Sequence, residues 1–199
     1  MKLSIIKYNA GNIQSVLYAL ERIGLQAVVT NDHDTIRSSD KVIFPGVGEA
    51  YSAMQSLRES NLDGLIKDLK QPVLGICVGM QLMCNYSEER NTGGLGIFNV
   101  AVKRFPSAAG VKIPQVGWNK IYDLDAPLFK GVNNGEYVYY VHSYYAETGS
   151  ETIARTDYGL EYSAALHKDN FYGVQFHTEK SAQTGEKILK NFLTNALNP

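Results

Sequence analysis

The sequence has little cysteine, and its two cysteines do not form a disulfide or metal-binding pattern. Cys77 and Cys84 have no histidine or further cysteine at ligand spacing. If a helix follows Cys77, about 10 Å of helical rise separates the two residues, which is beyond the reach of a disulfide. We therefore expect two free thiols, as in a reducing compartment, with no metal and no cofactor.

Long apolar runs and a charge excess are also missing. No apolar stretch approaches membrane-spanning length, and residues 1–7 are too short and too charged for a signal peptide. Lys and Arg total 19 against 20 Asp and Glu, a net charge of −1. This balance gives no sign of a nucleic-acid surface or an anchor to acidic lipids. The sequence thus predicts a cytoplasmic protein.

The sequence does contain enough apolar residues for a substantial core. Of the 199 residues, 44% are hydrophobic, and one domain over residues 1–199 is predicted. Predicted strands at 3–6, 27–29, 41–44 and 72–76 alternate with helices at 13–23 and 50–69, which indicates a parallel sheet covered on both faces. Aromatic and β-branched runs after Asn85 predict more strands, some antiparallel, before a last helix at 184–197.

A sharp turn from strand to helix is predicted at Cys77, which is flanked by Gly75 and Gly79. Such a turn exposes a nucleophile beside backbone N–H groups and at the positive end of a helix, which favours thiolate. The other interpretation is a buried structural cysteine between two glycines that end a strand.

Only one of the four histidines, His177, has an obvious orienting acid. Because residues two apart on an extended chain share a face, Glu179 can hold the ring nitrogen that does not meet the sulfur. The other interpretation is a strand-end histidine beside a solvated glutamate. His33 and His167 stand in polar stretches and are predicted to lie on the surface.

The segment Pro45-Gly46-Val47-Gly48 ends the predicted strand next to the Cys77 strand. Loops at the carboxyl ends of parallel strands converge on ligands, and its glycines let the backbone turn N–H groups inward. We expect the N–H groups of Val47 and Val78 to form an oxyanion hole, after a peptide flip at 46–48. The other interpretation is an ordinary turn.

These segments resemble the class I (triad-type) glutamine amidotransferases and, within that class, most closely the glutaminase subunits of imidazole glycerol phosphate synthases, from histidine biosynthesis. The resemblance covers essentially the whole chain and is carried by residues 8–13, 45–48, 75–82, 116–119, 141–144 and 173–181. The Gly-Trp-Asn and Pro-Gly-Val-Gly segments separate these subunits from the anthranilate, aminodeoxychorismate and guanylate relatives. The resemblance implies a flavodoxin-like α/β fold with a central, mostly parallel sheet flanked by helices and additional antiparallel strands in the C-terminal half.

The resemblance also implies a catalytic triad. Cys77 attacks the side-chain amide of L-glutamine to form a thioester, His177 transfers protons, Glu179 orients His177, and water releases glutamate. The positions that match the glutamine-holding motifs are Gly48, Gln81, Glu89, Ser143 and Tyr144. Without the resemblance, Gln81 and Glu89 would be interpreted as solvated helix and loop residues.

A partner is implied as well. In this family the ammonia passes to a separate (β/α)8-barrel synthase subunit, forming a heterodimer that makes imidazole glycerol phosphate and aminoimidazole carboxamide ribonucleotide. The positions that match the synthase-facing surface are Asn12, Ser15, Trp118, Tyr139 and Lys180. The other interpretation of Trp118 and Tyr139 is a place in the core. We expect the isolated chain to be a poor glutaminase that its partner activates.

Two positions depart from the family pattern. Thr178 stands after the catalytic histidine where proline is usual, and Pro114-Gln115-Val116 stands where Pro-His-Met is usual. Proline would preset the φ angle and help to hold Glu179 toward the ring. Three alternative functions remain: a glutaminase that feeds a different acceptor, a peptidase or stress-type hydrolase with the same cysteine turn, and a catalytically silent binding subunit.

Overall fold

The largest sheet of the protein carries the predicted Cys77 strand at its centre. The structure, a computed structural model, describes residues 1–9, 11–107 and 110–194. The strands of this sheet are β1 (Leu3–Ile6), β2 (Val28–Thr30), β3 (Lys41–Gly46), β4 (Val73–Cys77), β11 (Thr152–Asp157), β12 (Glu161–Lys168) and β13 (Phe171–Val174). Their spatial order is β11-β12-β13-β4-β3-β1-β2.

Five neighbouring strands of this sheet are parallel, from β13 through β4, β3 and β1 to β2. The two remaining strands, β12 and β11, continue the sheet antiparallel beyond β13. The prediction of a mostly parallel α/β sheet with antiparallel strands in the C-terminal half is therefore confirmed.

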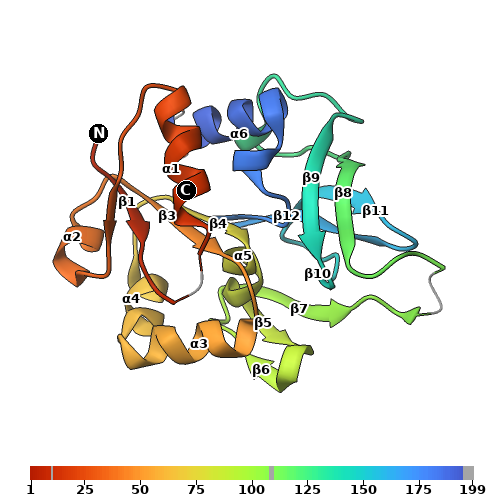
Figure 1. The fold of residues 1–199 in the computed structure, drawn as a ribbon, viewed down its shortest axis with the longest axis horizontal. Helices are drawn as coiled ribbons and strands as arrows, with labels where there is room; N and C mark the ends of the chain where they lie inside the picture. The colour runs from red at the N-terminus through yellow and green to blue at the C-terminus, as the bar shows by residue number, and fades with distance from the viewer. Residues whose placement is uncertain (10, 108–109, 195–199) are drawn as a thin grey trace.

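Helices cover both faces of the sheet, as parallel strands buried on two sides require. They are α1 (Ile13–Arg22), α2 (His33–Arg37), α3 (Ala50–Glu59), α4 (Leu62–Asp68), α5 (Val78–Met83) and α6 (Ala182–Thr194), with the 3₁₀ turns η1 (Glu89–Asn91), η3 (Pro127–Phe129) and η4 (Thr178–Lys180). Figure 1 shows α1 and α6 on one side of the sheet, and α3, α4 and α5 on the other.

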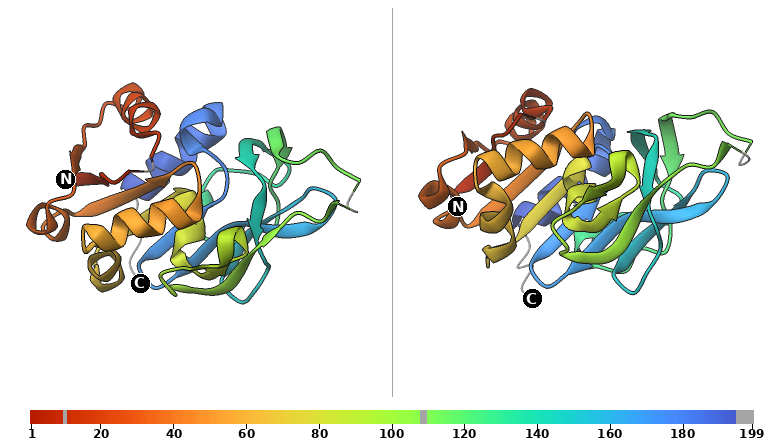
Figure 2. Two further views of the ribbon diagram at one scale, coloured as in Figure 1. Left: turned by 60° about the horizontal axis from the view of Figure 1, so that its bottom comes forward. Right: turned by 90° about the horizontal axis from the view of Figure 1, so that it is seen from below.

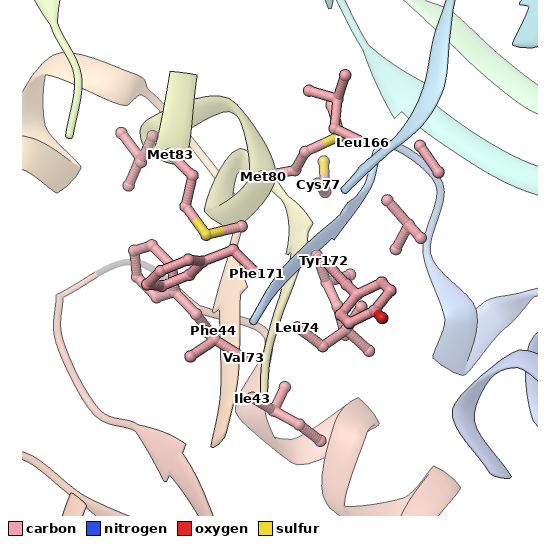
Figure 3. Packing of buried hydrophobic residues seen from close by; sticks show 14 of the residues in the cluster. Ile43, Phe44, Val73, Leu74, Cys77, Met80, Met83, Leu166, Phe171 and Tyr172 are labelled. Carbon is pink, nitrogen blue, oxygen red and sulfur yellow. The ribbon is translucent and has the colours of Figure 1, made fainter. Parts of the chain in front are cut away.

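The strand alternation decides which side chains meet which helices. Paired residues of parallel strands point the same way, so Val73 and Phe171 share one face while Leu74 and Tyr172 share the other. Figure 3 shows Met83 of α5 reaching the first face and Tyr172 standing on the second. All of these side chains are buried, and the sheet is the centre of a core with two layers.

Three predicted boundaries were wrong. The helix predicted at 50–69 is two helices, because Asn61 between them takes the left-handed conformation (φ 51°) and interrupts the hydrogen-bond ladder. Cys84 lies outside the helix that follows Cys77 and begins β5 (Cys84–Ser87) instead. The last helix starts earlier than predicted, at Ala182, and its predicted end at 195–197 falls outside the described residues.

Two smaller sheets form from the middle of the chain. One contains β5, β6 (Thr92–Gly93), β7 (Phe98–Arg104) and β10 (Tyr144–Ala146), and the other is the antiparallel pair β8 (Gln115–Lys120) and β9 (Tyr137–His142). Figure 2 shows these green-to-cyan segments at the end of the molecule opposite β1 and β2. The His142 end of β9 reaches the carboxyl end of β4, where the candidate site lies.

Candidate active site

Cys77 occupies a strained backbone position between β4 and α5. Its φ is +54° and its ψ −113°, a conformation that non-glycine residues rarely adopt and that is concentrated at functional sites. A side chain at Gly79 would collide with the Phe44 carbonyl of β3, so only glycine lets α5 approach the sheet this closely. The turn predicted from the glycine spacing is present, and Cys77 is buried at 3% exposure.

His177 and Glu179 form a buried pair beside this turn. The Nδ1 of His177 lies 2.7 Å from Oε1 of Glu179, and both side chains are almost fully shielded from solvent. Their spacing predicts that the two residues share one face of an extended strand, and this prediction was wrong. They lie at the start of η4, where one 3₁₀ turn brings Glu179 back under the ring.

The proton balance of His177 is shifted strongly toward the imidazolium. Burial opposes the charged ring, but hydrogen bonds with the Cys77 thiol and the Glu179 carboxylate, together with their charges, raise the pKa of His177 to about 10. A histidine held in this way can keep the proton that the thiol releases, while Nδ1 stays bound to Glu179.

A pocket of about 290 Å³ opens at the sulfur. Its walls include both triad candidates that face the opening, Cys77 and His177, and all five residues expected to hold glutamine. Those five are Gly48, Gln81, Glu89, Ser143 and Tyr144. Residues far apart in the sequence therefore converge on one cavity at the carboxyl ends of the parallel strands, as open α/β sheets favour.

Neither Gln81 nor Glu89 is the freely solvated residue of the alternative interpretation. Gln81 is 4% exposed, and its Nε2 donates to the Tyr144 carbonyl and to Oε1 of Gln175, each at 2.9 Å. Glu89 accepts a hydrogen bond from the Ala50 backbone N–H at the start of α3 (2.7 Å), and burial raises its pKa. Both side chains are held in place by the protein at the pocket wall.

His142 supports the pocket wall through hydrogen bonds at both of its ring nitrogens. Its Nδ1 lies 2.7 Å from the Tyr144 carbonyl, to which it must donate, and its Nε2 lies 3.0 Å from the Tyr162 hydroxyl. Burial lowers the pKa of His142 to about 4, despite the opposing hydrogen bond with Tyr144. The departure at Gln115 belongs to this network, because its Oε1 lies 2.7 Å from the Tyr162 hydroxyl.

The segment expected to supply an oxyanion donor lies beside the pocket, at the end of β3. Gly46 pairs with Cys77 across the sheet, and a side chain there would collide with the backbone of Gly79. Gly48, in contrast, has φ +90° and open space where a side chain would stand. Conformational freedom near Val47 therefore lies on the Gly48 side, whereas Gly46 is held by packing.

The candidate partner face lies on the outer side of β8 and β9. Trp118 is 52% exposed and Tyr139 is half-buried, which excludes the core interpretation for both. Their rings meet edge to face at 5.8 Å, and the Lys180 ammonium lies 6.0 Å from the Tyr139 ring. Asn12 and Ser15 stand half-buried at the start of α1, and no hydrogen bond or ring contact among the described residues joins them to this cluster.

The departure at Thr178 does not loosen the His177 turn. The His177 carbonyl accepts hydrogen bonds from the Lys180 N–H (3.1 Å) and the Ser181 hydroxyl (2.6 Å), and the His177 N–H donates to the Tyr139 carbonyl (2.9 Å). The Thr178 hydroxyl is buried and has no hydrogen-bond partner within the part of the chain that the structure describes. Hydrogen bonds to the backbone thus hold the turn without proline.

Four residues of the site were not predicted from the sequence. Three of them, Pro114, Val141 and His142, line the pocket together with Lys180, which was assigned to the partner face alone. The fourth is Gln175, whose Nε2 lies 3.8 Å from the Cys77 sulfur. The spacing Gln175-x-His177 carried a signal for it, because residues two apart on a strand share a face.

Other kinds of site find no support in the described ranges. No three His, Cys, Asp or Glu side chains gather there to hold a metal, and no helix there is long and apolar enough to cross a membrane. His33 contacts the Ser60 carbonyl, and His167 stacks on Tyr172, so both are partly buried surface residues away from the pocket.

Comparison with known proteins decides the family. The family model for class-I glutamine amidotransferases matches residues 4–196. The chain belongs to the class-I glutamine amidotransferases. The peptidase and silent-subunit interpretations therefore give way to glutamine amidotransferase chemistry, and the predicted flavodoxin-like amidotransferase fold is confirmed.

Among curated amidotransferase relatives, the chain is 59% identical to "Imidazole glycerol phosphate synthase subunit HisH" of Bacteroides fragilis, over 97% of this chain and 99% of the relative. The protein of the same name from Mannheimia succiniciproducens is 44% identical over 96% and 98%. Among solved structures, a putative GMP synthase chain from Thermoplasma acidophilum superposes with a TM-score of 0.75 at 20% identity, covering 97% and 92%. At that identity the structure supports the shared fold alone.

Proposed function

We propose that this amidotransferase is the glutaminase subunit of an imidazole glycerol phosphate synthase, acting in histidine biosynthesis. The observation that carries the proposal is the meeting of Cys77 with the His177–Glu179 pair at one pocket. It occurs in a chain 59% identical to a curated subunit of that synthase. The two free thiols suit the cytoplasm as its compartment.

The proposed reaction uses the groups of the pocket in turn. His177 takes the Cys77 thiol proton, and the thiolate attacks the side-chain amide carbon of L-glutamine. The resulting oxyanion is stabilised by the N–H groups of Val47 and Val78. His177 then protonates the leaving nitrogen, so that ammonia departs and a thioester remains. His177 next removes a proton from water, which attacks the thioester, and glutamate leaves as the thiol re-forms.

Glu179 keeps the His177 ring in the orientation that this sequence needs. Its Oε1 accepts from Nδ1, which leaves Nε2 for the sulfur and the leaving nitrogen. Glutamine is held by the residues of the pocket wall, Gly48, Gln81, Glu89, Ser143 and Tyr144. The pocket volume of about 290 Å³ suits a ligand of this size, at the lower end of small-molecule sites.

Ammonia is the useful product of this half-reaction. The proposal assigns its use to a (β/α)8-barrel synthase subunit that docks on the outer side of β8 and β9, around Trp118, Tyr139 and Lys180. Asn12 and Ser15 extend this contact on α1. The Tyr139 backbone also bonds His177 and Ser181, so the docking face and the catalytic turn share one strand.

A reconstitution assay tests the proposal. The purified chain is mixed with the barrel synthase of the same organism, and product formation from glutamine and from ammonium salt is measured. We expect glutamine-driven synthesis only when both chains are present. Glutamate release without any synthesis in the mixture, while the synthase still uses ammonium salt, would assign the glutaminase to a different acceptor.

A further inference from the structure

A buried amide, that of Gln175, lies against the reacting sulfur. Gln175 follows the last residue of β13, and the pairing of Val174 with Ile76 sets it beside Cys77 on the neighbouring strand. Its side chain is 0% exposed, and its Nε2 lies 3.8 Å from the Cys77 Sγ, within range of an N–H···S hydrogen bond.

The orientation of the Gln175 amide follows from two hydrogen bonds that Gln81 donates, one of them to a backbone carbonyl. The Tyr144 carbonyl can only accept, so the Gln81 side-chain atom 2.9 Å from it must be the NH2 nitrogen. The same nitrogen lies 2.9 Å from Gln175, which must therefore present its oxygen there. The remaining end of the Gln175 amide, which faces the sulfur, is the NH2 group.

The sulfur has a second polar neighbour of the opposite kind. The Val141 carbonyl lies 3.9 Å from Sγ and can only accept, so it favours the protonated thiol. The Gln175 N–H donates and favours the charged form, since a hydrogen bond to an ionised group stabilises that form. Of these two neighbours, it is the Gln175 donor that remains favourable to the thiolate once the proton has moved to His177.

We propose that Gln175 is a further catalytic residue, whose amide N–H binds the Cys77 sulfur and stabilises it as the thiolate. The proposal rests on the proposed role of Cys77 as the nucleophile. Through Gln81, the same relay links the sulfur to the Tyr144 backbone at the wall of the glutamine pocket. The reactive form of the nucleophile is thereby tied to the geometry of the substrate wall.

Other groups around the sulfur also influence its ionisation and stay constant in the test. His177 faces it from the loop after β13, and Tyr8, whose hydroxyl donates to the Pro45 carbonyl, faces it from the loop after β1. The pocket also holds Glu89 of η1, Lys180 of η4 and His142 of β9. None of these residues is changed in the variants below.

The pH dependence of Cys77 alkylation measures the effect directly. The Cys84→Ala background leaves Cys77 as the one thiol, and the rate of its reaction with iodoacetamide reports the thiolate fraction. Gln175→Met keeps the length of the side chain and removes the donor. We expect its alkylation rate near neutral pH to fall about tenfold, because less of the thiol is present as the reactive thiolate.

A second variant and a matched control separate this effect from a loss of structure. Gln175→Glu keeps the shape and places a carboxyl oxygen where the N–H stood, and we expect a shift in the same direction. Asn170→Ala removes another buried amide, which bonds the Leu69 and Gln71 carbonyls at the opposite end of β13. It should lower the melting temperature but leave the alkylation profile unchanged.

Two results overturn the proposal: an unchanged alkylation profile in folded Gln175→Met or Gln175→Glu, or an equal shift in Asn170→Ala. Steady-state kinetics add a second readout, with a fall in kcat expected to exceed the change in KM. Failure of the proposed function is visible separately, as glutaminase activity that survives Cys77→Ala. In that case the alkylation profile still reports whether Gln175 acts on the sulfur.

Discussion

The two sides of strand β9 differ in how far the chain itself buries their side chains. On the inner side, Tyr140 and His142 are buried, and both His142 nitrogens have partners. On the outer side, Tyr137 and Val141 stand in solvent at 51% and 38% exposure, beside the Trp118 ring of β8. One side of β9 thus forms part of the pocket wall. The other side is an apolar face that the described residues leave open to solvent.

This difference separates what the chain accomplishes alone from what it needs a partner to do. On the inner side, both ring nitrogens of the buried His142 are hydrogen-bonded, and a buried polar group that loses its partner costs about 1–3 kcal/mol. The apolar side chains of the outer side stay exposed to water in the free chain, and a docked protein would bury them. We therefore expect substitutions on the inner side to affect the free chain, and substitutions on the outer face to affect only the complex.

The largest expected effect comes from removing the nucleophile of the pocket that the inner side of β9 lines. Cys77→Ala should lower glutamine hydrolysis by at least about a thousandfold, because the thioester cannot form. The complex with this variant should still make product from ammonium salt. Cys84→Ala is the control, because Cys84 is buried against the Met80 carbonyl and burial raises its pKa. Substantial glutaminase activity in purified Cys77→Ala protein would contradict the role of Cys77.

The second expected effect is activation of the pocket by a partner that docks on the outer side of β9. We expect the free chain to hydrolyse glutamine about a hundredfold to a thousandfold more slowly than the complex with its ligand-bound partner. That range matches the loss of one oxyanion donor, here the Val47 N–H. Freedom at Gly48 permits the peptide to turn, and docking near Tyr139 acts on the His177 turn through the backbone bonds.

Steady-state glutaminase kinetics of the free chain and the complex check this activation. Ammonium-dependent synthesis by the same complex is the control, because it bypasses Cys77. Equal turnover of glutamine by the free and complexed chain would show that the oxyanion hole is permanently formed and that no switch exists.

The third effect sharpens the contrast within the hairpin. Trp118→Ala should weaken partner binding about thirtyfold or more, since truncating a central interface aromatic costs roughly 2 kcal/mol. Its melting temperature should stay near that of the wild type. Tyr140→Ala, on the buried inner side, should instead lose about 3–5 kcal/mol of folding stability. Calorimetric titration and thermal unfolding measure both, and a large stability loss in Trp118→Ala would contradict the docking face.

The fourth effect concerns acid. Because burial lowers the pKa of His142 to about 4, the unfolded chain takes up a proton below about pH 6.5 while the folded chain does not. Stability should therefore fall as the pH drops from about 6.5 toward about 4, by roughly 1–3 kcal/mol from this residue.

Urea unfolding at pH 7 and pH 5 measures this loss. His142→Asn, which keeps a donor near the Tyr144 carbonyl, should lose less stability on acidification than the wild type, even if it is less stable at pH 7. An identical decrease in both proteins would assign the acid sensitivity to other groups.

The smallest effect is a gain. Thr178→Pro should raise stability by about 0.5–1 kcal/mol, or a few degrees in melting temperature, because the first position of a helical turn accepts the fixed φ of proline. His177 before it is extended (φ −87°, ψ 103°), as a residue before proline must be. Thr178→Val is the matched control, which removes the unpartnered hydroxyl without fixing φ. A destabilised Thr178→Pro would mean that the turn depends on the threonine.

Much of the fold was predictable because its first half repeats one local pattern. The apolar strands 3–6 and 41–44, the glycines around Cys77 and the helix face of Val16 and Leu20 each carry local signals that agree with the parallel sheet. The break at Asn61 and the early end of α5 were missed, because a left-handed residue and a strand start have weak local signals. Cys77, His177 and the five predicted glutamine-holding residues converge on one pocket, but their spacing in the sequence could not show that.

The sequence by itself determined the alternation of strands and helices, the turn at Cys77 and, by resemblance, the amidotransferase family. These depend on residue types and spacings within short stretches of chain. Only the tertiary structure decided that Gln175 meets the Cys77 sulfur, that burial lowers the pKa of His142 and that the Trp118 ring faces solvent. Each of these depends on strand register and burial between segments distant along the chain, which local patterns do not specify.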